Sequence, residues 1–288
     1  MSLIPTTRRQ FLYSAAAAGT LAIAGDSVLL EPNLPRVVRR ELSLARWPER
    51  MNGFTIALLS DFHYDPYFSV HPLHAAVPLV NGLHPDLIAL AGDFVSVPPV
   101  GDPSKAAFAA EPCAKVIRQM RAPYGLWTVL GNHDCETDPE EVTRAVKADG
   151  IRVLQNQSQA IEQDGARFWL AGVDDVLSGT ADIAETLRSI PANDAVILLA
   201  HEPDFADEAA KFPIDLQLSG HSHGGQIRIP FVPLFYLPDL AKKYVMGTYH
   251  VGPLPLYTNA GIGTVNIPVR LNCPPEITLI TLRSARKG

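Results

Sequence analysis

The sequence predicts an α/β protein, and three observations support this fold class. Continuous apolar runs at 54–59, 87–91, 126–130 and 196–200 are typical of strands that are buried on both faces. Segments with helical spacing lie between these runs, and strands that alternate with helices imply βαβ units. An apolar content of 47% over 288 residues is enough for a sizeable core. Because ligands of such sheets bind beyond the carboxyl ends of the strands, a functional site is expected at that edge.

Residues 1–24 are expected to be an export signal that is not part of the fold. Arg8 and Arg9 precede a small-residue apolar run at 15–24, which ends in a small-residue cleavage site. The paired arginines resemble a twin-arginine signal. They predict the twin-arginine translocase as a partner, and export to the periplasm or to the outer face of the cytoplasmic membrane.

Two alternatives stay open for this first segment: an uncleaved membrane anchor, and an amphipathic N-terminal helix. The apolar run is shorter than the roughly 20 residues that a spanning helix needs. No acidic residue interrupts residues 1–25, which disfavours the amphipathic helix. A single domain is expected to follow, from residue 36 to residue 284.

The remaining elements are predicted from their periodicity. A strand at 37–44 alternates apolar with charged residues, which is typical of an edge or half-exposed strand. Helices are expected at 73–83, 105–120, 140–148, 181–189 and 204–211. Short strands of a second sheet are expected at 153–155, 159–162 and 168–171, and further strands at 214–218, 256–258 and 277–282.

Charge and cysteine content exclude some classes of protein. The net charge is −6 and no basic patch stands out, so no nucleic acid is expected as a stable partner. Cys113, Cys135 and Cys273 are odd in number and form no C-x-x-C motif. They therefore predict neither a disulfide framework nor a structural zinc site, and are expected to be small buried hydrophobes.

Five successive strand ends carry residue types that bind metals. They are Asp61 with His63, then Asp93, Asn132 with His133, His201, and finally His221 with His223. The last two lie on a glycine-flanked turn, and alternate residues at a strand end point to the same face. Because neutral imidazole is the commonest metal ligand, this pattern predicts a metal site.

Each of these residues also has an ordinary structural interpretation. Asp61 and Asp93 could each cap a helix, Asn132 could occupy a turn, and His63 could be a hydrogen-bonded core histidine. Taken together, these interpretations require five coincidences in sequence order. The metal site is therefore the better hypothesis.

The same residues resemble the five motifs of the calcineurin-like metallophosphoesterases, in the family's order. The motifs are Asp61-Phe62-His63, Gly92-Asp93, Gly131-Asn132-His133-Asp134, a single His201, and Gly220-His221-Ser222-His223. The later Cys273-Pro274-Pro275-Glu276 further resembles the bacterial YkuE-like branch, which is related to enzymes that cleave UDP-2,3-diacylglucosamine. The resemblance implies a four-layer α-β-β-α sandwich with a two-metal site at the carboxyl ends of the strands.

The resemblance also implies a role for each site residue. One metal is expected on Asp61, His63 and His223, the other on Asn132, His201 and His221, with Asp93 bridging the two. His133 is expected beside the phosphate without touching metal, and Asp134 is expected to orient its ring.

These residue types fit phosphoester hydrolysis. Two divalent ions about 3.5–4 Å apart can clamp a phosphoester and share a bridging hydroxide, which attacks phosphorus in line. A bridging ligand is expected to offer two oxygens, which calls for a carboxylate at position 93. Mixed histidine and carboxylate ligands favour Mn, Fe or Zn over Mg. His133 could protonate the leaving oxygen.

The segment 227–240, rich in Pro, Phe, Leu and Tyr, directly follows the last motif. Its prolines argue against a regular helix or central strand. It is expected to form a wall or lid for an amphiphilic substrate such as a lipid-linked phosphate or diphosphate, or a peripheral membrane contact. The alternative is a loop folded onto its own core. Arg228 could bind a phosphate, or could be a surface charge.

Two classes of function therefore stay open at this point. The first is a metal-dependent phosphohydrolase, acting as a phosphomonoesterase, phosphodiesterase or pyrophosphatase. The second is a metal-stabilised binding module that has the same fold but no turnover. The complete ligand set together with His133 favours the enzyme.

Overall fold

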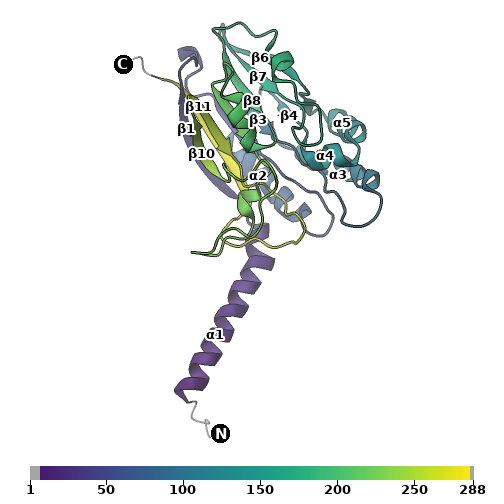
Figure 1. Cartoon of the computed structure of the whole chain (residues 1–288), viewed down its shortest axis with the longest axis vertical. Helices are drawn as coiled ribbons and strands as arrows, with labels where there is room; N and C mark the ends of the chain where they lie inside the picture. Colours follow the sequence, from purple (N-terminus) through teal and green to yellow (C-terminus); the bar gives the residue numbers. More distant parts are fainter. Residues whose placement is uncertain (1–6, 286–288) are drawn as a thin grey trace.

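Two six-stranded sheets organise the computed structural model, which describes residues 7–285 (Figure 1). The first sheet has the order β1 (Arg36–Leu44), β12 (Glu276–Ser284), β2 (Thr55–Leu59), β3 (Leu87–Leu90), β4 (Leu126–Thr128), β5 (Arg152–Val153). The second has the order β10 (Gly247–Val251), β11 (Leu254–Thr258), β9 (Leu216–Ser219), β8 (Ala195–Leu199), β7 (Ala166–Gly172), β6 (Gln157–Gln163). The central strands β2 to β5 are parallel, as are β7, β8, β9 and β11.

Three apolar clusters divide the molecule into four layers. The helices α2 (Val70–Leu83), α3 (Ala110–Ile117) and α5 (Pro139–Ala148) pack on the outer face of the first sheet. A second cluster lies between the two sheets. The helices α6 (Ile183–Leu187) and α7 (Ala206–Ala209) pack on the outer face of the second sheet. The predicted α/β class and α-β-β-α sandwich are confirmed.

The strand β2 shows why its sequence is apolar from Ile56 to Leu59. Ala57 and Leu59 pack among the helices of the first layer, whereas Ile56 and Leu58 pack against the second sheet. Successive side chains of a strand point to opposite faces, so a strand between two apolar layers needs apolar residues throughout.

Several predicted elements differ from the structure. The helix expected at 105–120 is a 3-10 helix, η4 (Pro103–Ala109), followed by α3, because Pro112 has no N–H and fits only the first turn of an α-helix. The segment 153–155 was expected in the second sheet, but β5 pairs with β4 in the first. The helix expected at 204–211 is the 3-10 helix η5 (Pro203–Phe205) and the single turn α7.

The helix α1 (Arg8–Gly25) projects away from both sheets, and none of its residues is buried (Figure 1). Thr7 caps the N-terminus of the helix and forms a capping box with Gln10. Residues 1–6 of the predicted export signal lie outside the described residues. With the turns that follow it, α1 is long and apolar enough to cross a membrane by length and composition.

Two short turns join α1 to the domain. They are η1 (Asp26–Leu30) and η2 (Glu31–Asn33). The carbonyl of Ser27 accepts a hydrogen bond from the Arg270 N–H, and the Glu31 carboxylate accepts from the N–H groups of Asn272 and Cys273. Residues upstream of position 36, where the domain was expected to begin, therefore already contact it.

Candidate metal centre

The predicted site residues come together where the carboxyl ends of the two sheets meet. Asp61 and His63 follow β2, Asp93 follows β3, and Asn132 begins the short helix α4 (Asn132–Thr137) after β4. His201 follows β8, and His221 and His223 follow β9. The first sheet therefore supplies four of these residues and the second supplies three, as the sequence pattern predicts.

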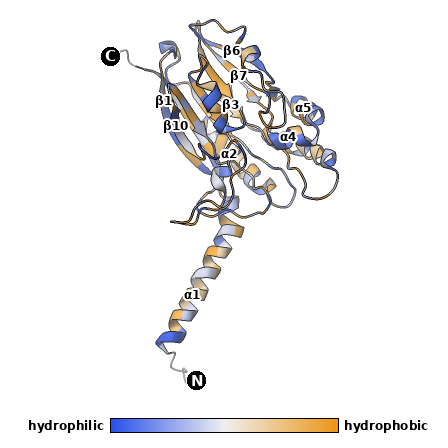
Figure 2. Cartoon of the chain, in the orientation of Figure 1, coloured by the Kyte–Doolittle hydropathy of each residue, from blue (hydrophilic) through white to orange (hydrophobic). Residues whose placement is uncertain are grey.

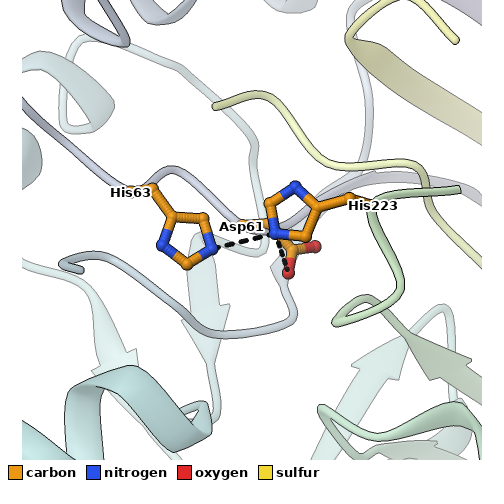
Figure 3. Close-up of side chains that lie close together, drawn as sticks. All are labelled: Asp61, His63 and His223. Carbon is orange, nitrogen blue, oxygen red and sulfur yellow. Dashed lines mark hydrogen bonds and ion pairs between the residues drawn. The ribbon is translucent and has the colours of Figure 1, made fainter. Parts of the chain in front are cut away.

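Asp61, His63 and His223 form one group of potential ligands (Figure 3). The Nε2 atoms of His63 and His223 lie 2.9 Å apart, and His223 Nε2 lies 3.5 Å from Asp61 Oδ1. All three side chains are buried. Three ligand atoms so close together surround one point, as the ligands of a single cation do.

Asp93, His201 and His221 form a second group. His201 Nε2 lies 3.2 Å from Asp93 Oδ2. His201 Nε2 and the nearby amide oxygen of Asn132 are both buried without a hydrogen-bond partner. Buried polar atoms are nearly always paired, so these orphaned atoms fit a site made for a cation.

Asp93 connects the two groups through a single oxygen. Its Oδ2 lies 3.4 Å from His63 Nε2 on one side and 3.2 Å from His201 Nε2 on the other. Its Oδ1 accepts a hydrogen bond from the backbone N–H of His133 at 3.0 Å. One oxygen therefore faces both groups, and the other holds the neighbouring loop.

Hydrogen bonds fix the tautomers of two ligand histidines. His201 donates Nδ1–H to the carbonyl of Ala91 at 2.5 Å, and His221 donates Nε2–H to the carbonyl of Asp239 at 2.9 Å. Carbonyls only accept, so the opposite ring nitrogens carry no proton when the rings are neutral. This arrangement is usual for metal-bound histidine.

His133 lies beside both groups, half-buried at the edge of the cavity. It forms a third cluster of potential ligands with His63 and Asp93. Its Nδ1 accepts a hydrogen bond from the backbone N–H of Val97 at 2.8 Å. Because an amide N–H only donates, the neutral ring carries its proton on Nε2. That nitrogen is therefore available to donate a hydrogen bond.

Asp134 does not orient His133, contrary to the expectation from the resemblance. Its carboxylate accepts hydrogen bonds from four backbone N–H groups, those of Asp93, Phe94, Val95 and Gly131. Both oxygens are occupied by these donors. Asp134 therefore joins the loop after β3 to the loop after β4, and Val97 orients the His133 ring.

Burial sets the protonation of the site. Desolvation lowers the pKa of His63 and of His221 to about 3, which keeps both rings neutral, the form that binds metal. Burial also opposes a charge on His201, but the Asp93 carboxylate outweighs it and raises the pKa of His201 well above its usual value. Burial raises the pKa of Asp61 to about 6. Bound cations would favour the ionised carboxylates.

The backbone around the site is unusual. Left-handed φ angles occur at five predicted ligands, namely Asp61, His63, Asp93, His221 and His223. Non-glycine residues rarely adopt this conformation, which costs of order 1–3 kcal/mol each and is concentrated at functional sites. The sequence carries no signal for it.

A cavity of about 600 Å³ opens beside Asp93, Asn132 and His133. Its other walls come from segments 97–99, 235–238 and 265–267, which contribute Pro, Val, Ile, Phe and Tyr side chains. No lysine or arginine belongs to this lining, and Glu136 supplies a carboxylate. The segment 227–240 contains no helix or strand, as its prolines predict, and forms part of the cavity wall.

Several other polar residues and the three cysteines do not take part in the metal centre. The Arg228 guanidinium donates to the Gly224 carbonyl and does not line the cavity. The carboxylates of Asp174 and Asp175 accept hydrogen bonds from the backbone of residues 175–180, so they stabilise a turn. Cys113, Cys135 and Cys273 are all free, and Cys113 and Cys273 are buried.

The sequence did not reveal two residues that hold the ligands in place without belonging to the ligand set, Ser96 and Arg270. The Ser96 hydroxyl lies 2.9 Å from His63 Nδ1. The fully buried Arg270 donates to the carbonyls of Ala260, Gly261, Gly263 and Cys273, and so holds the loop that packs on Asp61. No motif marks these residues, because their contacts depend on the tertiary fold.

Comparison with known proteins decides the family. The family model described as calcineurin-like phosphoesterase matches residues 54–225. The chain belongs to this family. The predicted resemblance to the calcineurin-like metallophosphoesterases is thereby confirmed, and family membership identifies the chain as a metal-dependent phosphohydrolase.

Two similar proteins match almost end to end. The uncharacterized metallophosphoesterase YkuE of Bacillus subtilis (strain 168) is 34% identical over 286 residues, which cover 96% of this chain and 98% of that protein. Phosphodiesterase YaeI of Escherichia coli (strain K12) is 32% identical over 283 residues, which cover 96% of this chain and 99% of that protein.

The solved structures support the fold alone. The sulfate thiohydrolase SoxB of Thermus thermophilus superposes with a TM-score of 0.51 at 12% identity. The superposition covers 80% of this chain and 56% of that one, so the chain spans little more than half of that structure's length.

Proposed function

We propose that the chain is a two-metal phosphodiesterase whose substrates carry an apolar group. The observation that carries this proposal is the lining of the cavity, which has no lysine or arginine and includes the Glu136 carboxylate. A phosphomonoester carries about 1.5–2 negative charges at neutral pH, whereas a diester carries one. Apart from the metals, no cationic lysine or arginine side chain lines the cavity to balance the substrate's charge. The cavity therefore suits the singly charged diester better than a monoester or a diphosphate.

The ligand residues would form two sets, each of which would hold one divalent cation. Asp61, His63 and His223 would hold one, and Asn132, His201 and His221 the other. Asp93 would contact both through Oδ2, the oxygen that faces both histidine groups. When bound, such cations supply Lewis-acid polarisation of the phosphoryl oxygens and a water nucleophile of lowered pKa. The histidine and carboxylate donors favour Mn, Fe or Zn.

His133 is placed to complete the reaction. Its Nε2–H can donate to the leaving oxygen, while the Val97 N–H holds the other ring nitrogen in place. The ring also lines the cavity, so a substrate that reaches the metals contacts it. Because Nδ1 stays unprotonated, the neutral ring keeps its Nε2 proton and stabilises the charge on the leaving oxygen by a hydrogen bond in this proposal.

The apolar walls supply the preference for an amphiphile. Phe235 and Tyr236 line the cavity beside the metal ligands, and each is more than half exposed to solvent. An alkyl or acyl group of a substrate would bury part of this surface, at about 25 cal/mol per Å² of apolar area. Lipid-linked phosphodiesters have this combination of one phosphate charge and an apolar chain.

A substrate panel with added Mn tests this proposal. Bis(p-nitrophenyl) phosphate, p-nitrophenyl phosphate and a phospholipid diester should be compared for wild type, Asp93→Ala and Glu136→Gln. Diesters are expected to give the higher kcat/KM, and Glu136→Gln is expected to raise monoester turnover selectively. A preference for the monoester would overturn diester specificity, and activity no higher than that of Asp93→Ala would indicate a binding module without turnover.

We also propose that the chain is exported by the twin-arginine route. Support comes from Arg8 and Arg9 at the start of a helix that has no acidic residue and no buried one. Replacing both by lysine keeps the charge but removes the arginine pair, so this variant should stay in the cytoplasm while wild type reaches the periplasmic or membrane fraction. Wild type that stays in the cytoplasm contradicts the proposal.

A further inference from the structure

We propose that the end of the molecule at the base of α1 is a lipid-contact surface. This surface, here called the apolar face, combines three segments that are distant in the sequence, 28–30, 67–68 and 229–236, together with the single position 267. Its exposed side chains include Leu29, Tyr67, Phe231, Phe235, Tyr236 and Ile267.

Hydrogen bonds show that these segments lie side by side. The Gln226 side chain donates to the carbonyls of Val265 and Ile267, and the Asn272 side chain donates to the carbonyl of Arg228. These bonds join the loop 227–240 to the loop 264–272. The second loop in turn contacts the start of the domain, because the Arg270 N–H donates to the Ser27 carbonyl.

Residues 67–68 complete the apolar face. They line a cavity of about 250 Å³ together with residues 28–29 and with Gly263, Thr264 and Pro268. Figure 1 shows the loops gathered where α1 leaves the domain. The three segments therefore form one continuous surface.

The exposure of this surface is costly in water. Phe231 is fully exposed, and Phe235 and Tyr236 are 68% and 64% exposed. Clustered exposed apolar residues mark interaction sites, and burying one such side chain is worth about 1.5–3 kcal/mol. A partner that covers this face therefore buries several such side chains, and each of them adds to the free energy of binding.

The helix α1 indicates that this partner is a lipid bilayer. Its 18 residues span about 27 Å at 1.5 Å per residue, close to the thickness of a hydrocarbon core. None of them is buried against the domain, and the strongest hydrophilic colour lies at the N-terminal end (Figure 2). A bilayer around α1 would touch the apolar face, because the helix ends there.

The charges on α1 give the same orientation. Arg8 and Arg9 lie at the end of α1 that is farthest from the domain. Basic residues stay on the cytoplasmic side of a membrane, so this arrangement places the domain on the other side. The apolar face then lies on the outer leaflet.

This orientation has a consequence for the catalytic cavity, which rests on the proposed function. Phe235 and Tyr236 belong both to the apolar face and to the cavity lining. The cavity therefore opens at the lipid surface. A diester with an acyl chain could reach the metal ligands while its chain stays in the membrane.

Tryptophan fluorescence in the full-length chain tests the apolar face without turnover. Phe231→Trp and Phe235→Trp are mixed with phosphatidylethanolamine–phosphatidylglycerol vesicles whose acyl chains are brominated, a quencher confined to the hydrocarbon. The matched control is Phe108→Trp in η4, which replaces a phenylalanine that is about as exposed as Phe235 and is not part of the apolar face. The signal of the unsubstituted chain, which has three tryptophans, is subtracted.

The two test variants are expected to shift to shorter wavelength and to lose at least half of the added fluorescence, whereas the control should change little. If the protein sediments with the vesicles but the test variants are not quenched, the proposal is overturned. In that case α1 alone would hold the protein on the vesicles. A blue shift that needs no vesicles and grows with protein concentration would overturn it in favour of a second copy of the chain. If the test variants are quenched but the protein hydrolyses no diester, the proposed function is rejected. The proposal that the apolar face contacts lipid is still supported in that case.

Discussion

At the residue scale, the proton on His133 Nε2 is the feature most directly tied to chemistry. The Val97 N–H occupies Nδ1, so the ring has one defined role as a donor. Loss of one hydrogen-bond donor to a developing oxyanion costs about 10²- to 10³-fold in rate. The size of this loss depends on how much negative charge the leaving oxygen develops.

His133→Asn is therefore expected to lower kcat by about 10²- to 10³-fold on a diester with an alkyl leaving group. The loss should be much smaller on bis(p-nitrophenyl) phosphate, because nitrophenolate is a stable anion that needs little stabilisation. Metal content, measured by elemental analysis, should equal that of wild type. Equal losses on both substrates would show that His133 does not donate to the leaving oxygen.

A second prediction at this scale concerns Asp134, whose carboxylate accepts four backbone N–H groups. Asp134→Asn places an amide NH₂ among these donors and should lower the free energy of unfolding by about 2–4 kcal/mol in urea titrations. Asp182→Asn is the matched control, because an asparagine caps α6 as well as an aspartate does. Equal stability of the two variants would mean that Asp134 contributes no structural support.

Residue types at the strand ends were predictable from the sequence, but their conformations were not. Asp61, Asp93 and His221 could be singled out because carboxylate and imidazole are ligand types at the correct edge of a sheet. Their left-handed φ angles leave no trace in residue type. The actual role of Asp134 was also hidden, because its partners are backbone atoms, which are the same in every sequence.

At the scale of elements, the turn after β9 depends on close backbone approach. A Cβ atom on Gly220 would lie 2.5 Å from both Asp61 Oδ2 and Ser60 Oγ. Glycine is therefore required here for space. This contact links the last ligand turn to the first one, across the two sheets.

Gly220→Ala should weaken metal binding on the Asp61 side by roughly 10- to 100-fold, the usual cost of disturbing a ligand's support. Competition with a fluorescent chelator measures this affinity. Gly82→Ala in α2 is the control, because its added Cβ meets nothing within 4 Å. An unchanged affinity in Gly220→Ala would contradict the tight fit.

The periodicity of apolar residues predicted the elements that are buried. It failed where an element is only partly buried, or where tertiary contacts determine which sheet a strand joins. The strands β2, β3 and β8 follow from their apolar runs. In contrast, β10 was missed because none of its residues is buried and its pairing with β11 keeps it in the sheet. The segment at β5 was assigned to the wrong sheet, because a two-residue strand carries no information about its neighbour.

At the scale of the whole molecule, the metal ligands connect the two sheets. Asp61, Asp93 and Asn132 belong to the first sheet, whereas His201 and His223 belong to the second. A ligand that binds only the folded state stabilises it by about 2.7 kcal/mol at 100 times its Kd. Metal binding should therefore stabilise the whole sandwich and not only a loop.

Chelation with EDTA is accordingly expected to lower the thermal midpoint of the full-length chain by several degrees. Re-addition of Mn should restore the midpoint. Asp93→Ala, which removes the shared oxygen, should respond much less to either treatment. Differential scanning calorimetry measures this, and an identical response of wild type and Asp93→Ala would contradict the shared role of Asp93.

Electron paramagnetic resonance of the Mn-loaded chain tests the shared site most directly. With Asp93 Oδ2 facing both histidine groups, two Mn ions per chain are expected to give an exchange-coupled signal. The coupling should disappear in Asp93→Ala. A six-line spectrum of isolated Mn at full loading of wild type would contradict a two-metal centre bridged by this carboxylate.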